Sequence, residues 1–148
     1  MKLLVKIIAI CLYASYSYGQ QTLKLQKVSG AENPNSAVEN YYLFKISNAT
    51  KSSVSFKLMA ANTACEDESL KYTNIKHVIL DARKAKKLDK ITVEANGSLE
   101  FFVKTIRPYN AQLDTWNCTK VLAVDSKGNS ISNELFIELL IPDSRNDN

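Results

Sequence analysis

The sequence feature that most constrains the fold is a regular alternation of side-chain character over residues 53–60. Every second residue is apolar, and these positions are Val54, Phe56, Leu58 and Ala60. Successive side chains of a β-strand point to opposite faces, so this pattern gives one buried face and one wet face. The segment therefore predicts a half-buried strand.

The same period of two predicts strands along most of the chain. We expect them at residues 23–26, 41–46, 91–95, 99–104, 116–124 and 135–141, with a further strand near 72–80. Residues 81–87 are expected to form one or two helical turns. Closely spaced strands with almost no amphipathic helix predict an all-β sandwich.

Two turn signals separate the later strands. Asn96-Gly97 is a tight-turn dipeptide, so residues 91–106 are expected to be two strands that meet at a short corner. Such paired strands could bring Glu94 and Glu100 opposite each other. Residues 125–129 are expected to connect a hairpin, with Gly128 free to adopt a positive φ.

Two segments carry a resemblance to known domains. Residues 120–130 resemble the F–G hairpin of fibronectin type III domains, and residues 41–58 are similar to the B–C region of bacterial immunoglobulin-like domains. Asn117 and Thr119 stand where the type III pattern has a strand-F tyrosine. The resemblance implies an immunoglobulin-like antiparallel β-sandwich of about seven to eight strands, used for adhesion, spacing or protein contact.

The N-terminal residues 1–19 are typical of a secretory signal peptide. Lys2 and Lys6 flank and interrupt a short apolar run, and Ser17 and Gly19 are the small residues that a signal peptidase requires. The run is shorter than the about 20 residues that span a bilayer. We expect cleavage before Gln20, a β-sandwich domain over residues 20–142 and a flexible polar tail at 143–148. The mature chain, with no membrane span, would be secreted or periplasmic, or stay in the cell envelope.

Charge and cysteine content agree with an exported binding protein. Removal of residues 1–19 lowers the formal net charge from +4 to +2, which gives no case for nucleic-acid binding. The same cleavage removes Cys11 and leaves Cys65 and Cys118. An even number of cysteines in an exported chain predicts one disulfide between them.

Candidate catalytic and metal-binding residues are few. His77 is the only histidine, and no G-x-S-x-G motif provides a nucleophilic serine. The acidic run at residues 66–68 lacks the spacing of a calcium loop, so we expect a solvated loop there. We therefore expect no enzyme activity, no cofactor and no metal site.

The candidate binding residues lie in the longer or charged connections. A basic run contains Arg83, Lys84, Lys86 and Lys87, and Tyr109 is the aromatic residue most expected to be exposed. Trp116 is expected to pack near the disulfide. The loops expected to bind are 61–70, 81–90 and 107–115.

The sequence thus predicts an exported, non-catalytic binding or structural module that contacts a protein or glycan partner. The alternative is a small secreted ligand-binding protein or enzyme inhibitor that acts through its loops. Three N-x-[ST] sequons begin at Asn48, Asn96 and Asn117. The first two lie in predicted turns, where a glycan would fit.

Overall fold

The computed structural model describes residues 22–67 and 69–143. These residues form eight strands: β1 (Leu23–Ala31), β2 (Glu39–Asn48), β3 (Val54–Thr63), β4 (Lys76–Asp81), β5 (Lys90–Val93), β6 (Ser98–Ile106), β7 (Thr115–Val124) and β8 (Leu135–Ile141). The predicted signal peptide and the predicted tail beyond Asp143 lie outside the described residues.

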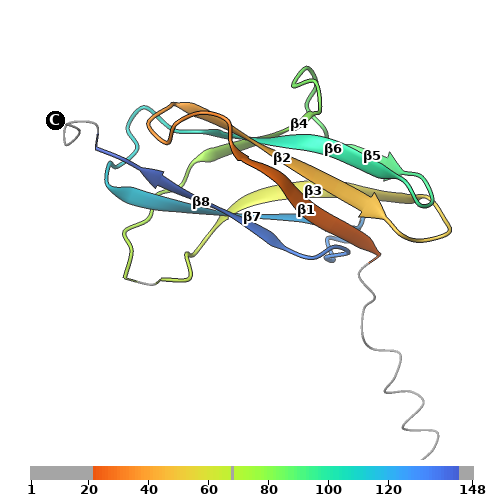
Figure 1. The fold of residues 1–148 in the computed structure, drawn as a ribbon. Coiled ribbons are helices and arrows are strands. Elements are labelled where there is room, and N and C mark those ends of the chain that lie inside the picture. Colours follow the sequence, from red (N-terminus) through yellow and green to blue (C-terminus); the bar gives the residue numbers. More distant parts are fainter. Residues whose placement is uncertain (1–21, 68, 144–148) are drawn as a thin grey trace, which may run out of the picture.

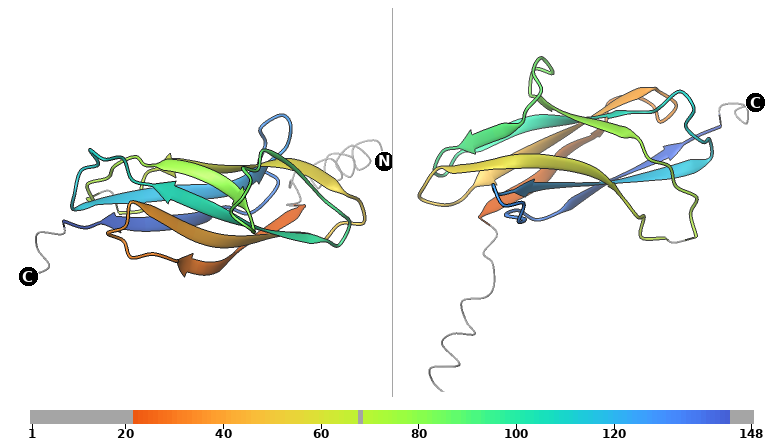
Figure 2. Two further views of the ribbon diagram at one scale, coloured as in Figure 1. Left: turned by 90° about the horizontal axis from the view of Figure 1, so that it is seen from above. Right: turned by 180° about the vertical axis from the view of Figure 1, so that it is seen from behind.

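The strands form two stacked antiparallel sheets (Figures 1 and 2). One sheet has the order β1-β2-β6-β4 and the other has the order β5-β3-β7-β8. This arrangement is an immunoglobulin-like β-sandwich, so the predicted fold class and strand number are confirmed. Within the described ranges, the chain has no helix long and apolar enough to cross a bilayer.

The core lies between the sheets and is built from the predicted alternating positions. Phe44 of β2 and Phe101 of β6 are fully buried, and their rings stack with centroids 5.7 Å apart. Phe56 of β3 and Ile137 of β8 face them from the other sheet as part of the same apolar cluster. Burial of each such side chain contributes about 1.5–3 kcal/mol.

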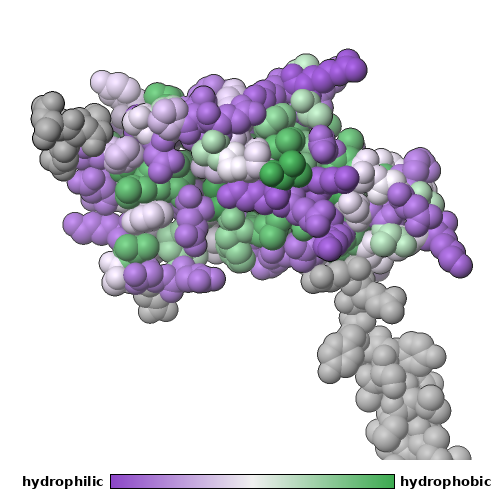
Figure 3. All heavy atoms as spheres, viewed as in Figure 1, coloured by the Kyte–Doolittle hydropathy of each residue, from purple (hydrophilic) through white to green (hydrophobic). Residues whose placement is uncertain are grey.

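The side chains between the core positions of each strand point outward, and most of them are polar. Figure 3 shows polar side chains over most of one face, with apolar side chains in smaller groups between them. Met59 of β3 and Phe136 of β8 are examples of exposed apolar residues. Isolated apolar residues on a surface are ordinary and need no partner.

The Asn96-Gly97 corner carries the chain from one sheet to the other. β5 pairs with β3, whereas β6 pairs with β2 and β4, so the two strands do not pair with each other. The expectation that Glu94 and Glu100 oppose each other on paired strands is therefore wrong. Asn96 has φ 55°, which an asparagine tolerates better than most residues.

The strand expected near residues 72–80 is present as β4, but it begins only at Lys76, and Tyr72 forms an isolated bridge to Trp116. The expectation of helical turns at residues 81–87 is wrong, because residues 81–88 form a hairpin. Its turn is stabilised because the Asp81 carboxylate accepts the N–H groups of Ala85 and Lys86, at 2.8 and 3.2 Å. These local bonds favour a turn over a helix.

The predicted disulfide joins Cys65, in the connection after β3, to Cys118 of β7, with Cα atoms 5.3 Å apart. The same connection also pairs with β7 through its backbone. Thr73 N–H donates to Trp116 C=O, and Trp116 N–H donates to Lys71 C=O, each at 2.8 Å. Trp116 is half-buried on the same face of β7 as Cys118. The long connection between β3 and β4 is thus fixed to the second sheet.

Candidate functional site

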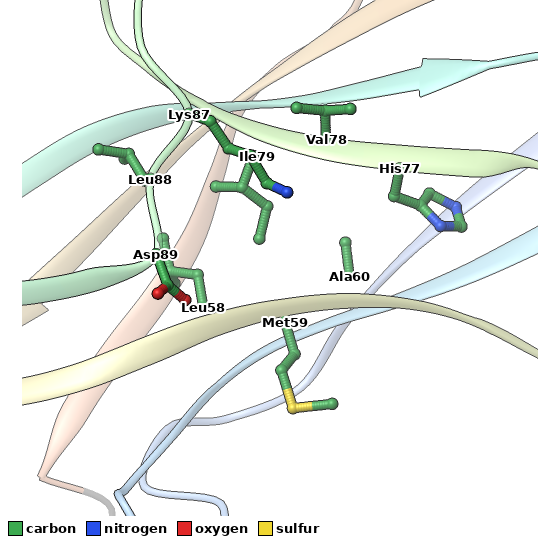
Figure 4. Close-up of a pocket in the computed structure, with 9 residues that line it drawn as sticks. All are labelled: Leu58, Met59, Ala60, His77, Val78, Ile79, Lys87, Leu88 and Asp89. Carbon is green, nitrogen blue, oxygen red and sulfur yellow. The ribbon is translucent and has the colours of Figure 1, made fainter.

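A shallow groove lies between β3 and β4, where one sheet ends beside the other (Figure 4). Its cavity volume is about 260 Å³. Its walls come from β3, β4 and the connection to β5: Leu58, Met59, Ala60, His77, Val78, Ile79, Lys87, Leu88 and Asp89. Ala60 and Ile79 point into the space between the strands, and the Lys87 side chain extends toward it (Figure 4).

The groove is open because both neighbouring strands have incomplete pairing there. β4 is the outermost strand of its sheet and pairs with β6 on one side. β5 pairs only with Val54–Lys57 of β3, so the described remainder of β3 has a strand partner on the β7 side alone. Two strand edges therefore lie beside the same groove.

The outer edge of β4 is covered at one end by its own hairpin. Leu88 N–H donates to Ile79 C=O and Asp81 N–H donates to Lys86 C=O, each at 2.9 Å. Alternate residues of a strand present their backbone groups to the same side, so His77 also faces this edge. Within the described part of the chain, no backbone hydrogen bond covers His77 on this side.

The side chain of His77 points inward and joins a polar network between the sheets. Asn62 anchors the network: its amide exchanges two hydrogen bonds with the backbone of Ile75, at 3.0 and 3.1 Å. The Asn117 amide nitrogen then donates to Asn62 Oδ1 at 2.7 Å and to Thr73 C=O at 2.9 Å. Both acceptors fix the orientation of the Asn117 amide.

This orientation also fixes the proton on His77. Thr119 Oγ1 donates its single proton to Asn117 Oδ1 at 2.8 Å. His77 Nε2 lies 2.7 Å from Thr119 Oγ1 and must therefore donate to it. Burial lowers the pKa of His77 below its ordinary value. His77 is thus a neutral structural donor in this arrangement, with Nε2 committed to the network.

The basic run divides into one residue that is held and others that are exposed. Lys84, at φ 58°, forms an ion pair with Glu32, and its ammonium lies 4.5 Å from the ring centroids of both Tyr41 and Phe102. These contacts fasten the hairpin to the outer face of its own sheet. Lys84 is therefore used within the fold.

Arg83, Lys86 and Lys87 remain exposed, and none forms an ion pair within 4 Å of a described carboxylate. Two nearby acids have other partners. Asp81 accepts backbone N–H groups, and these bonds hold the pKa of its carboxyl below the usual value. Asp89 lies 3.6 Å from Lys57 Nζ. Along residues 81–89 these three exposed cations exceed the two carboxylates by one positive charge, and of the three only Lys87 lines the groove.

Tyr109 belongs to a different region. It is fully exposed and lines a second hollow of about 320 Å³. Val38, Arg107 and Leu113 line that hollow too, and none of its lining residues belongs to the groove. The structure therefore does not bring Tyr109 together with the basic run.

The other predicted sites have simpler explanations. Asp67 accepts from the hydroxyl and N–H of Ser69, at 2.6 and 2.9 Å, which closes a local turn and lowers the pKa of Asp67. Among residues 22–67 and 69–143, no group of three or more His, Cys, Asp or Glu is placed to hold a metal ion.

Only one sequon asparagine is exposed. The amide nitrogen of Asn48 is buried and donates to the carbonyls of Ser52, Val93 and Glu94 at 2.8–3.1 Å. Asn117 is buried in the network described above. The expectation that a glycan would fit at Asn48 is therefore wrong, whereas Asn96 lies in an exposed turn.

Sequence reasoning missed the groove itself. Leu58, Ala60 and Ile79 read as ordinary alternating core positions, and only the pairing of distant strands leaves an opening beside them. One signal was available. Lys76 begins a short strand, and a lysine on a short strand is a common mark of a sheet edge.

The fold has solved counterparts, although no protein-family model and no curated protein sequence matches the chain. A FixG-related protein from Vibrio parahaemolyticus superposes with TM-score 0.52 and 13% identity, covering 80% of this chain and 93% of its own. The ASH/PapD-like domain 7 of human CEP192 gives TM-score 0.48 and 7% identity, over 85% and 89%. The first likeness supports the immunoglobulin-like fold alone. The fibronectin type III resemblance stays a prediction.

Proposed function

We propose that this protein is an exported, non-catalytic binding module that works through protein–protein or cell-surface contacts. The observation that carries the proposal is the groove between β3 and β4, where two incompletely paired strand edges lie beside exposed basic side chains. Unpaired strand edges are surfaces on which another chain can form backbone hydrogen bonds.

Export is supported by two independent features. Residues 1–19 have the composition of a signal peptide, and the Cys65–Cys118 disulfide is typical of oxidising compartments. The absence of catalysis is an inference from His77. Its Nε2 donates to Thr119, so the histidine that would be the natural general base serves the core instead.

The alternative function is a ligand-binding protein or enzyme inhibitor that acts through its loops. The specific observation in its favour is the hollow beside Tyr109, which has an exposed aromatic ring next to Val38 and Leu113. Exposed aromatic residues are frequent anchors of protein interfaces.

An affinity capture tests the proposal. The purified chain beginning at Gln20 would be immobilised under oxidising conditions and exposed to extracellular and envelope fractions of its native source. We expect one stoichiometric protein partner, and Tyr109→Ser should still capture it. Loss of capture with Tyr109→Ser would favour the loop alternative, and no captured macromolecule would overturn the binding proposal. N-terminal sequencing of the exported protein should start at Gln20.

A further inference from the structure

We infer that the open edge of β4 binds an extended acidic segment of a partner protein and adds it to the sheet as one more strand. This inference rests on the proposed function and specifies the site and the chemistry of the ligand. It is carried by three properties of the same edge: its backbone, its groove and its charge.

The backbone supplies the first argument. The hairpin shows that this edge accepts a strand, because residues 86–88 already bond to Ile79 and Asp81. Beyond them, the N–H and C=O of His77 face the same side. Within the described residues these two groups have no backbone partner. An incoming strand would continue the pairing that the hairpin begins.

The groove supplies the second argument, because it sets the side-chain pattern of the ligand. His77 and Ile79 point inward and Val78 lies on the other face of β4 (Figure 4). The alternation of side chains along the strand places Lys76 on the same face as Val78. Leu88 already lies opposite Ile79, so the open position of the edge is the one opposite His77. A residue of the added strand there would also point inward, toward Ala60, and the ligand therefore needs an apolar residue at that position.

Charge supplies the third argument. The outward residues of the added strand would lie near Lys76 and Lys87, which are both exposed, and the exposed Lys86 adds charge at the hairpin end of the edge. The neighbouring carboxylates of Asp81 and Asp89 are engaged by backbone N–H groups and by Lys57. Glutamate or aspartate at the outward positions would complement this charge.

The probe is a labelled peptide of about eight residues in which Val and Glu alternate, since this is the length of an ordinary strand. We expect saturable binding by fluorescence anisotropy, weakened by salt. Hydrogen exchange should slow at the amide of His77. A Val-Lys peptide of the same length should bind at least tenfold more weakly. Equal binding of the two peptides would contradict the charge argument.

Two variants test the site. His77→Pro removes the outward N–H, and His77→Ala is its matched control because it loses the side chain but keeps that N–H. We expect the proline variant to bind the Val-Glu peptide at least tenfold more weakly than the alanine variant. Lys86→Glu/Lys87→Glu should have a similar effect, and Lys24→Glu, on distant β1, should change binding less than twofold.

The charge variants keep the inference testable if His77→Pro does not fold, as judged by circular dichroism. Absence of peptide binding to the folded wild type would overturn it. So would unchanged binding by the Lys86→Glu/Lys87→Glu variant. The proposed function fails separately: a native partner captured equally by wild type and the charge variant would leave the binding module standing and remove only this site.

Discussion

The two halves of β7 face the same interior but hold it together in different ways. In residues 120–124, the apolar half, Val121 and Ala123 are fully buried in the main apolar cluster. In residues 115–119, the polar half, Asn117 and Thr119 occupy the equivalent inward positions and are also buried. Apolar burial is non-directional, whereas each hydrogen bond requires a specific partner in a specific place.

This difference between apolar packing and directed hydrogen bonds explains which part of the sandwich must be held in an exact position. The apolar half lies beneath regular pairing with β3 and β8. The polar half lies beside the long connection between β3 and β4, whose described residues form no strand before Lys76. Directed bonds from Asn117 and Thr119, together with the disulfide, fix this connection and His77 at the start of the β4 edge.

The largest expected effect is on the apolar side of this comparison. Phe44→Ala should lower the free energy of unfolding by about 3–5 kcal/mol, because it leaves a cavity against Phe101. Urea unfolding measures this loss. Phe136→Ala, at an exposed position on β8, is the control and should cost less than about 1 kcal/mol. Equal losses of unfolding free energy in the two variants would show that burial of Phe44 between the sheets does not stabilise the fold.

Removal of the disulfide should have the second-largest effect and should destabilise the polar half. The Cys65→Ala/Cys118→Ala variant should lose about 2–4 kcal/mol, since the bond closes a separation of 53 residues. Dithiothreitol should shift the thermal midpoint of the wild type downward and leave that of the variant unchanged. A wild-type midpoint insensitive to reduction would contradict the bond.

The polar network should show a smaller cost. Asn117→Ala removes two donated bonds and leaves Thr119 without its acceptor, so we expect a loss of about 2 kcal/mol. Hydrogen exchange should accelerate in residues 71–77 more than in residues 121–124. Asn110→Ala, at an exposed loop position, serves as the control. A uniform acceleration along β7 would mean that its two halves unfold together.

The pH dependence should give the smallest effect. Burial lowers the pKa of His77 in the folded chain below its ordinary value of 6.5. The unfolded chain then binds the proton more readily, so the contribution of His77 to stability is constant above this value and declines as the pH falls below about 6.5. His77→Gln should flatten the free energy of unfolding between about pH 7 and pH 5. An unchanged slope would remove His77 as its cause.

The sequence predicted the apolar half of the molecule well because local alternation reports burial directly. Phe44, Phe56 and Ile137 lie inward as their patterns require. The disulfide followed from cysteine parity and the signal-like segment, without any knowledge of geometry. The Gly128 turn is also confirmed, with φ 86° and a bond from Gly128 N–H to Asp125 C=O.

The polar half could not be predicted in the same way. Asn117 and Thr119 are polar in sequence, yet they face the core, because their partners come from residues about 40–55 positions away. The assignment of β4 and β5 to different sheets also depends on distant pairing. The groove follows from that assignment, so its location could not be read from local patterns. Lys87 was identified as a binding candidate, but its place beside a strand edge was not.

The buried sequon asparagines have a consequence for producing this protein in other cells. Sugar transfer would modify the amide nitrogens of Asn48 and Asn117, which donate to carbonyl and amide oxygens inside the sandwich. A eukaryotic secretory host attaches glycans to such sequons while the chain is still being made. A glycan at either position would occupy space that the folded interior needs, whereas one at Asn96 would extend into solvent. The yield of folded protein from such a host therefore depends on whether Asn48 and Asn117 escape modification.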